Sequence, residues 1–204
     1  MNKANNNPSL IFMVGVAGSG KSTVGEVLAE KLNYTYLDKN ALTRVFTEKL
    51  LEVNGLPTWD RESEFYLANI RPYEYQILMD VAEENLKLGN DVILSAPFLK
   101  EIQDENWLEE EVRSKRDLKD IDIKVVHVLA GREAEKRRLT KRNTPRDTWK
   151  LKNWDIYSKD IDGISMSWPE EMVFNFYNQK EVKDDNFLGS AVMKERLEGI
   201  MEFL

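Results

Sequence analysis

The nine residues 15–23 constrain this chain more than any other segment. They read Gly15-Val16-Ala17-Gly18-Ser19-Gly20-Lys21-Ser22-Thr23. A continuous apolar run, residues 10–16, precedes the loop, as expected of a buried parallel strand, and an amphipathic helical pattern follows it through Lys31. The spacing Gly-x-x-x-x-Gly-Lys-Ser between a strand and a helix is that of a phosphate-binding P-loop.

Each residue type in this loop has a physical reason. Glycines let backbone N–H groups point at phosphate oxygens, next to the positive end of the following helix. Lys21 would place a point charge on the β- and γ-phosphates, and the Ser22 hydroxyl would ligate Mg²⁺. The alternative is a chance glycine-rich turn, which the flanking strand and helix disfavour. We therefore predict that residues 15–23 bind a nucleoside triphosphate, with Lys21 also catalytic.

Strand and helix patterns alternate along the rest of the chain. Further helices are predicted over about 42–51, where apolar residues recur at helical spacing, and at 73–88, 104–119, 133–142 and 188–204, and residues 143–169 look irregular. The predicted strands after the first are 34–37, 91–95, 124–129 and 172–177. This alternation predicts a three-layer α/β/α fold with a mainly parallel five-stranded sheet, in a single domain over residues 1–204.

Composition excludes several other kinds of site. The chain has no cysteine, which excludes a disulfide scaffold, a thiolate zinc site and a cysteine nucleophile. Its one histidine, His127, excludes a multi-histidine metal site and lies in an apolar strand, where a structural role is expected. No apolar run approaches the roughly 20 residues that span a membrane, and residues 10–16 are too short for a signal peptide. We expect a cytoplasmic protein that does not enter membranes.

Charge is unevenly distributed along the chain. The net charge is −7, yet residues 131–152 carry nine Lys and Arg against three acids. This window is therefore +6 and the remainder −13. An acidic body argues against a general nucleic-acid binder. The concentrated basic window instead suggests a local anionic ligand.

Motifs of several P-loop classes are missing. The guanine-reading pattern N-K-x-D and the ABC signature L-S-G-G-Q do not occur. The third predicted strand ends in Ser95-Ala96-Pro97, whereas AAA-type and helicase motors close this strand with an acidic pair. These absences disfavour GTPases, ABC ATPases and ring motors.

Several segments together resemble the small P-loop kinases, in particular gluconate kinases and chloramphenicol phosphotransferases. These segments are the P-loop, Tyr36-Leu37-Asp38, Gly55-Leu56-Pro57 followed by Asp60-Arg61, Val92-Ile93-Leu94-Ser95-Ala96-Pro97, and Arg138-Leu139-Thr140-Lys141-Arg142. The resemblance implies a mobile lid at about 131–169 and an acceptor-binding insertion at about 38–90. Residues 142–155 differ from the gluconate-kinase lid and no histidine follows Asp38, so gluconate itself is not assigned.

Asp38 ends the second predicted strand, where ligands bind in open α/β sheets. Its carboxylate could bind the acceptor, take the proton of the acceptor hydroxyl or help to hold Mg²⁺. It could equally cap the helix that begins near Asn40, and the two roles are compatible.

Three arginines recur every four residues in the basic window. Arg138, Arg142 and Arg146 could neutralise charge that develops as the phosphoryl group transfers. The alternative is a solvated basic helix paired with nearby acids. We expect Asp147 to orient Arg146.

The insertion supplies further candidates for the acceptor pocket. Arg44 and Arg61 are predicted to bind the acceptor, with Asp60 and Arg71 as further polar candidates, although each could be a surface charge. Three tryptophans, at positions 149, 154 and 168, are expected to pack the lid against the body.

Together these features predict an ATP- and Mg²⁺-dependent kinase that phosphorylates a hydroxyl of a small acceptor. ATP follows from the resemblance, and GTP stays open. One alternative is a polynucleotide or nucleoside 5′-hydroxyl kinase, in which the basic window tracks a backbone. Another is a regulatory switch that hydrolyses the nucleotide slowly. The oligomeric state is left open.

Overall fold

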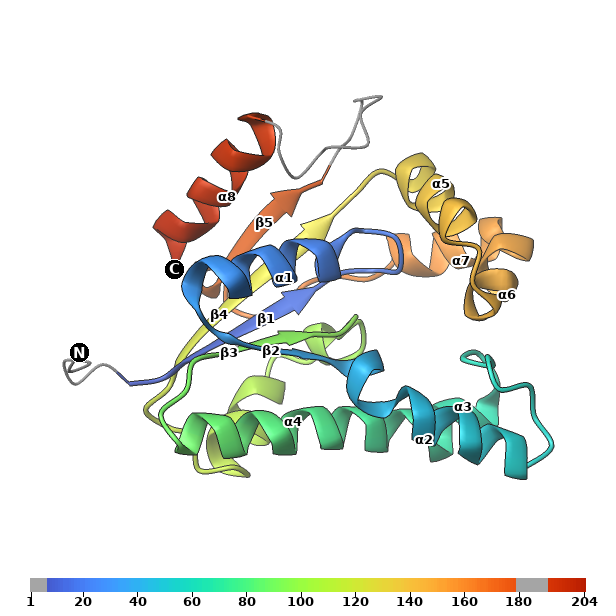
Figure 1. Cartoon of the computed structure of the whole chain (residues 1–204), viewed down its shortest axis with the longest axis horizontal. Helices are drawn as coiled ribbons and strands as arrows, with labels where there is room; N and C mark the ends of the chain where they lie inside the picture. Colours follow the sequence, from blue (N-terminus) through green and yellow to red (C-terminus); the bar gives the residue numbers. More distant parts are fainter. Residues whose placement is uncertain (1–6, 179–190) are drawn as a thin grey trace.

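The computed structural model describes residues 7–178 and 191–204. Five strands form one parallel sheet in the order β2-β3-β1-β4-β5 (Figure 1). They are β1 Ser9–Val14, β2 Thr35–Asp38, β3 Val92–Ser95, β4 Asp122–Leu129 and β5 Val173–Tyr177. The predicted five-stranded parallel sheet is confirmed.

Helices cover both faces of the sheet, which explains why its central strands are continuously apolar. Leu10 and Phe12 of β1 face α4 (Arg71–Lys87). Ile11 and Met13 face α1 (Lys21–Leu32) and α8 (Ala191–Phe203). The three-layer prediction is thus confirmed. The first three residues of the predicted helix 188–204 lie outside the described residues.

Between β2 and β3 the chain forms α2 (Lys39–Val53), α3 (Glu64–Asn69) and α4. The sequence patterns did not predict α3, because six residues are too few to show helical periodicity. Its local start signal is clear, however. The Ser63 side chain caps it by accepting a hydrogen bond from the Tyr66 N–H at 3.2 Å.

Helix α2 buries several polar residues and exposes several apolar ones, although Leu51 near its end is buried. Val45 and Phe46 are 66% and 69% exposed, whereas Thr43 and Thr47 are buried. The cause lies across the interface, since α4 presents Glu74 to α2, and a buried carboxylate needs polar partners.

The segment after β4 is mostly helical, so the prediction of an irregular segment at 143–169 was wrong. Helices α5 (Arg132–Arg142), α6 (Thr148–Lys152) and α7 (Trp154–Asp162) follow one another, with the short turn η3 (Pro145–Asp147) between the first two. Trp154, Tyr157 and Ile161 form a buried cluster with Leu139 and Val16. Packing against α5 and against Val16 after β1 therefore stabilises helices that periodicity alone did not reveal.

The remaining elements are short. They are the 3-10 turns η1 (Glu101–Gln103) and η4 (Glu170–Met172), and the π-helix η2 (Leu108–Ser114). The π-helix η2 replaces the longer helix predicted at 104–119. Trp168 is buried and stacks on Trp107 with 5.6 Å between ring centroids. Among the described residues, no helix is both long and apolar enough to cross a bilayer.

Candidate active site

The glycine-rich loop 15–20 connects β1 to α1 at the carboxyl end of the sheet. Gly18 and Gly20 have φ angles of +86° and +95°. A Cβ on Gly18 would lie 2.9 Å from the Glu135 carbonyl oxygen, and one on Gly20 would lie 2.3 Å from the Asn178 side-chain nitrogen. These two positions therefore require glycine both for the backbone conformation and for space.

Lys21, the first residue of α1, lines a cavity beyond the loop. Burial lowers the pKa of the Lys21 ammonium to about 8. Asp38 opposes this shift, while Arg142, Arg146 and Lys39 add to it. A lysine in such surroundings favours an anionic ligand, which would restore the stability of its charged form.

Asp38 caps α2, as predicted, and its second carboxylate oxygen is left for other contacts. Its Oδ1 accepts hydrogen bonds from the N–H groups of Asn40 and Ala41 at 2.9 and 3.1 Å, which caps α2. Its Oδ2 accepts from the Ser22 hydroxyl at 3.4 Å. One oxygen is thus structural, and the other faces the end of the P-loop.

Ser22 and Asp38 fit a magnesium ion. Mg²⁺ prefers oxygen ligands, and beside a nucleotide it usually takes one or two from protein, with phosphate oxygens and waters completing the shell. Within residues 7–178 and 191–204, no group of three His, Cys, Asp or Glu side chains forms a preformed metal site. The two oxygens therefore suit an ion that arrives with the nucleotide.

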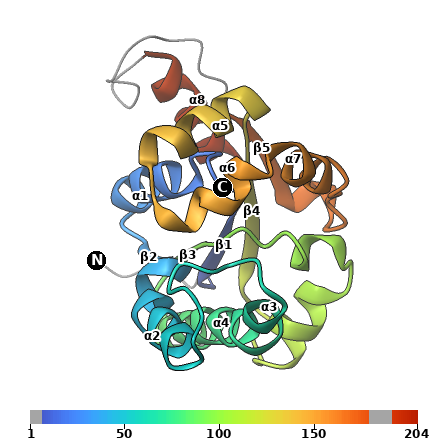
Figure 2. The same ribbon diagram turned by 90° about the vertical axis from the view of Figure 1, so that its right-hand side faces the viewer.

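The cavity has a volume of about 280 Å³ and is bounded by distant parts of the chain. Helices α5, α6 and α7 lie on one side of it, and α2, α3 and α4 on the other (Figure 2). Its wall carries eight cationic side chains and two acidic ones. The cations are Lys21, Lys39, Arg61, Arg71, Lys100, Arg142, Arg146 and Lys150, and the acids are Glu62 and Asp147.

Arg142 and Arg146 both line this cavity, as expected of arginines that meet a phosphate. The buried Asp147 carboxylate accepts two hydrogen bonds from Arg142, at 2.6 and 2.8 Å. The expectation that Asp147 orients Arg146 was wrong, because Asp147 pairs with Arg142 at the end of α5. Burial, and then the charge of Arg142, lowers the pKa of Arg146.

Arg138 lies apart from the other two predicted arginines. Its guanidinium donates to the carbonyl oxygens of Gly18, Ser19 and Asn178, each at 2.9 Å. The Asn178 side chain also donates to the Ser19 carbonyl at 2.6 Å. Arg138 thus hydrogen-bonds to the P-loop backbone and does not line the cavity. Sequence reasoning missed Asn178, whose only signal was its position directly after a predicted strand.

Arg44 and Arg61 were both predicted to bind the acceptor, but the structure brings only Arg61 to the cavity. The Arg44 side chain is 59% exposed and pairs with Glu48 along the outer side of α2. Asp60, another candidate, accepts hydrogen bonds from the backbone N–H groups of Glu62 and Ser63 and so shapes the loop before α3.

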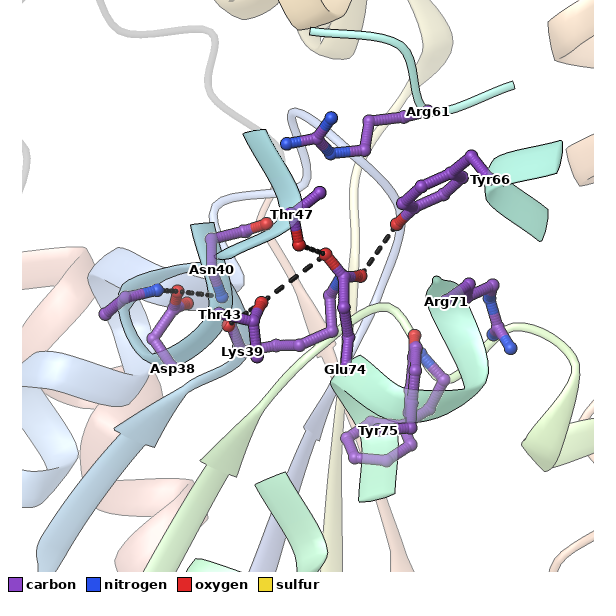
Figure 3. A network of polar contacts seen from close by, with 12 residues as sticks. Asp38, Lys39, Asn40, Thr43, Thr47, Arg61, Tyr66, Arg71, Glu74 and Tyr75 are labelled. Carbon is purple, nitrogen blue, oxygen red and sulfur yellow. Dashed lines mark hydrogen bonds and ion pairs between the residues drawn. The ribbon is translucent and has the colours of Figure 1, made fainter. Parts of the chain in front are cut away.

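Sequence reasoning missed a buried polar network behind the side of the cavity that α2, α3 and α4 form (Figure 3). Glu74 forms an ion pair with Lys39 and accepts hydrogen bonds from Thr47 at 2.6 Å and Tyr66 at 2.7 Å. Burial raises the pKa of Glu74, but Lys39 and these hydrogen bonds outweigh it, so the pKa lies below its usual value. The signal was present, because Lys39, Thr43 and Thr47 recur every four residues and share a helix face.

The tryptophans and the histidine have different surroundings. Trp154 is buried, as expected of a residue that packs the lid, whereas Trp149 is 41% exposed. Trp168 packs in the core beneath β1 rather than in the lid. His127 lies in β4, and burial lowers the pKa of its imidazole.

The chain has a five-stranded parallel sheet with a P-loop at its carboxyl end, and this loop faces a cationic cavity under a helical segment. This arrangement is the fold of the P-loop kinases. A family model described as AAA domain matches residues 10–158. The chain therefore belongs to this family. The prediction against AAA-type ring motors rests on β3 ending in Ser95 without an acidic pair, and it stays a prediction.

Curated relatives match shorter stretches. A cytidylate kinase from Symbiobacterium thermophilum is 37% identical over 83 residues, which are 41% of this chain and 36% of that protein. A shikimate kinase from Synechococcus elongatus is 33% identical over 100 residues, 48% of this chain and 45% of that one. The chain thus spans less than half the length of these two relatives.

Solved structures match over nearly the whole chain. A protein from Chloroflexus aurantiacus described as a kinase has a TM-score of 0.66 at 16% identity, with 98% of this chain and 100% of that one covered. A gluconokinase from Sinorhizobium meliloti has a TM-score of 0.53 at 16% identity, with 97% and 94% covered. At these identities the likeness shows the fold alone.

Proposed function

We propose that this chain is an ATP- and Mg²⁺-dependent phosphotransferase that moves the γ-phosphate of ATP to a hydroxyl of a small acceptor. One observation carries the proposal: Lys21 and side chains of α2, α3 and α4 face the same cavity. A phosphate donor and a second molecule could thus meet there. Relatives named for kinase activity toward shikimate and cytidylate support this class of reaction.

The P-loop N–H groups and Lys21 would bind the β- and γ-phosphates. Ser22, and Asp38 through water, would hold Mg²⁺, which when bound neutralises charge on the phosphates. Arg142, fixed by Asp147, and the neighbouring Arg146 would stabilise charge on the transferring group.

In the transfer, the bond between the γ-phosphorus and the β,γ-bridging oxygen breaks. A bond forms between that phosphorus and the acceptor oxygen, and Asp38 takes the hydroxyl proton. Arg138 would act as a positioning residue, since it holds the carbonyl side of the P-loop.

We also propose that two segments of one domain have different roles. The insertion at about 38–90 would bind the acceptor and the segment at about 131–169 would cover the nucleotide. The positions of α2–α4 and α5–α7 on the two sides of the cavity support this division. Closure of the lid would exclude water, so that the phosphoryl group meets the acceptor and not water.

The test is release of ADP from Mg²⁺-ATP in the presence of single acceptors. The panel contains sugar acids, polyols, nucleosides, nucleotides, aminoglycosides and an oligonucleotide with a 5′-hydroxyl, and Lys21→Ala is the blank. We expect one small acceptor to raise turnover far above hydrolysis by water. We also expect Asp38→Asn, which preserves the helix cap, to lower kcat by about 100-fold or more.

Two results would contradict the proposal. Stimulation by the oligonucleotide alone would indicate a polynucleotide kinase. Slow hydrolysis that depends on Lys21 and that no acceptor accelerates would indicate a regulatory switch.

A further inference from the structure

The side of the cavity that we assign to the acceptor carries several cations, and nearby carboxylates neutralise only some of them. Lys39 is paired with Glu74. Arg71 is 3.0 Å from Glu101 and lies over the Tyr75 ring, 4.2 Å from its centroid. These two cations are neutralised by carboxylates behind the wall.

Arg61 differs from both of them. Its guanidinium donates to the carbonyl oxygens of Thr58 and Asp60 at 3.1 and 2.6 Å. Among the side chains that the structure describes, no carboxylate forms an ion pair with it. The adjacent Asp60 carboxylate is used by the backbone of Glu62 and Ser63.

Arg61 is nevertheless held in place. The guanidinium lies over the Tyr66 ring at 5.3 Å from the centroid, and Tyr66 is itself fixed by its hydrogen bond to Glu74. Figure 3 shows Arg61 above the network, on the same side as Tyr66. A half-buried arginine that is oriented by an aromatic ring and lacks an anionic partner is a preformed site for an oxyanion.

The charges around Arg61 make an anion more favourable still. Lys39, Arg71 and Arg146 line the same cavity. Burial lowers the pKa of both Lys39 and Arg146, and repulsion from Arg61 adds to this shift. An anion bound beside Arg61 would relieve this repulsion.

In the proposed function, Lys21, Arg142 and Arg146 serve the nucleotide. Burial lowers the pKa of Lys21, and the charges of Arg142, Arg146 and Lys39 lower it further. Arg61 instead belongs to the loop before α3, in the segment between β2 and β3 that we assign to the acceptor. We propose that the acceptor carries, besides its hydroxyl, an anionic carboxylate or phosphate group that Arg61 binds.

This inference rests on the proposed function and narrows its substrate class. Acceptors without a negative charge would leave the Arg61 guanidinium desolvated and unpaired, which is costly. Hydroxy acids and phosphorylated alcohols or nucleosides fit the site, whereas neutral polyols and nucleosides do not.

The first experiment compares acceptors in pairs that differ mainly in charge: gluconate and sorbitol, shikimate and its methyl ester, and cytidine monophosphate and cytidine. Within the productive pair we expect the anion to have a kcat/KM at least about 100-fold higher. Arg61→Gln should remove this preference and leave the KM for ATP within about twofold, and Arg61→Lys should retain part of it. Arg137→Gln, which removes an exposed arginine outside the cavity wall, is the matched control.

Equal use of the neutral partner would overturn the inference. So would an Arg61→Gln variant in which the KM for ATP rises as much as the KM for the acceptor, because Arg61 would then serve the nucleotide.

The second experiment does not depend on turnover, so it separates failure of this inference from failure of the proposed function. The P-loop is saturated with Mg²⁺-ADP, and thermal unfolding is followed as malonate or inorganic phosphate is added. We expect one of these anions to raise the midpoint of the wild type and of Arg137→Gln but not of Arg61→Gln. The more effective anion indicates whether a carboxylate or a phosphate is bound. No increase, or an equal increase in Arg61→Gln, would overturn the inference.

Discussion

Burial and three neighbouring cations disfavour the proton on Lys21, and Asp38 favours it. Bound phosphates would add the negative charge that the site lacks. The protonated form of Lys21 is therefore less stable without nucleotide than with it. For this reason nucleotide affinity should depend on pH.

We expect the affinity for Mg²⁺-ATP to be nearly constant below pH 7 and to fall above pH 8. The pKa of Lys21 in the free protein is about 8, so at higher pH binding must first restore the proton. The decrease should approach about tenfold per pH unit. Calorimetry in two buffers of different ionisation enthalpy should show proton uptake on binding near pH 8 and above.

The matched control is Lys21→Met, whose weaker affinity should vary little over this range. Lys21 should affect folding in the opposite sense. Between pH 8 and the higher pKa of the unfolded chain, the unfolded state binds more protons, so the contribution of Lys21 to stability improves as pH rises. An affinity that does not change up to pH 9 would contradict the prediction.

At the scale of single residues, local sequence motifs identified candidate site residues. Contacts between residues far apart in the sequence could not be predicted. The P-loop spacing singled out Lys21, which lines the cavity, and Ser22, which lies beside Asp38, because the backbone path of the loop is specified within nine residues. Arg44 and Arg61 could not be separated in this way. They are chemically identical, and only the packing of α2 shows that Arg44 faces outward.

At the scale of secondary structure, the interface between α2 and α4 depends on polar contacts. Lys39 and Glu74 form a buried ion pair, with Thr43, Thr47 and Tyr66 around the carboxylate. Such a pair is not itself strong evidence of stability, but removal of one partner leaves a buried charge uncompensated.

We expect Glu74→Ala to lower the free energy of unfolding by about 3–5 kcal/mol, because Lys39 would remain buried without its partner. The double variant Lys39→Met with Glu74→Leu should recover most of this loss. Urea unfolding followed by tryptophan fluorescence measures both changes. A loss below about 1 kcal/mol for Glu74→Ala would mean that Lys39 finds another partner or reaches solvent.

The same interface explains why the sequence predicted α2 but not its orientation. Helical spacing of Leu42, Val45, Phe46 and Leu50 indicates a helix correctly, yet three of these four side chains are exposed. The pattern of apolar residues locates a buried face only when the neighbouring element is apolar. Here the neighbour contributes Glu74, which no property of α2 reveals.

At the scale of the whole molecule, an ion pair connects the two sides of the cavity. Lys150 of α6 pairs with Glu62 in the loop before α3, with side chains 14% and 29% exposed. The pair connects the segment that would cover the nucleotide to the segment that would bind the acceptor. Binding of a ligand on one side of the cavity should therefore change the affinity of the other side for its ligand.

We expect Glu62→Gln and Lys150→Gln each to weaken binding of a Mg²⁺-bound non-hydrolysable ATP analogue by about fivefold, through a coupling of about 1 kcal/mol. The double variant should bind no more weakly than either single one. Isothermal calorimetry on the four proteins measures the cycle. Additive effects would show that the two residues act independently.

The architecture of the sheet was only partly predictable. Apolar runs revealed the number of strands, because each buried strand must be apolar on both faces. Their order was not predicted, since it depends on which crossovers pack together. Residues 143–169 were missed because α6 and α7 are short and packing against residues such as Val16 and Leu139 stabilises them.

The placement of β2 beside β3 has a consequence for how this protein could diversify. The chain leaves the sheet after Asp38, at the carboxyl end of β2, and returns at Val92, at the amino end of the neighbouring parallel strand β3. Everything between forms one excursion between two strands that lie side by side in the sheet. Replacement of that one continuous stretch would exchange the far wall of the cavity and leave the glycine loop, Lys21 and Arg142 untouched. Ancestral chains of this kind could therefore have changed partners by substituting one module while inheriting the phosphate-handling half intact.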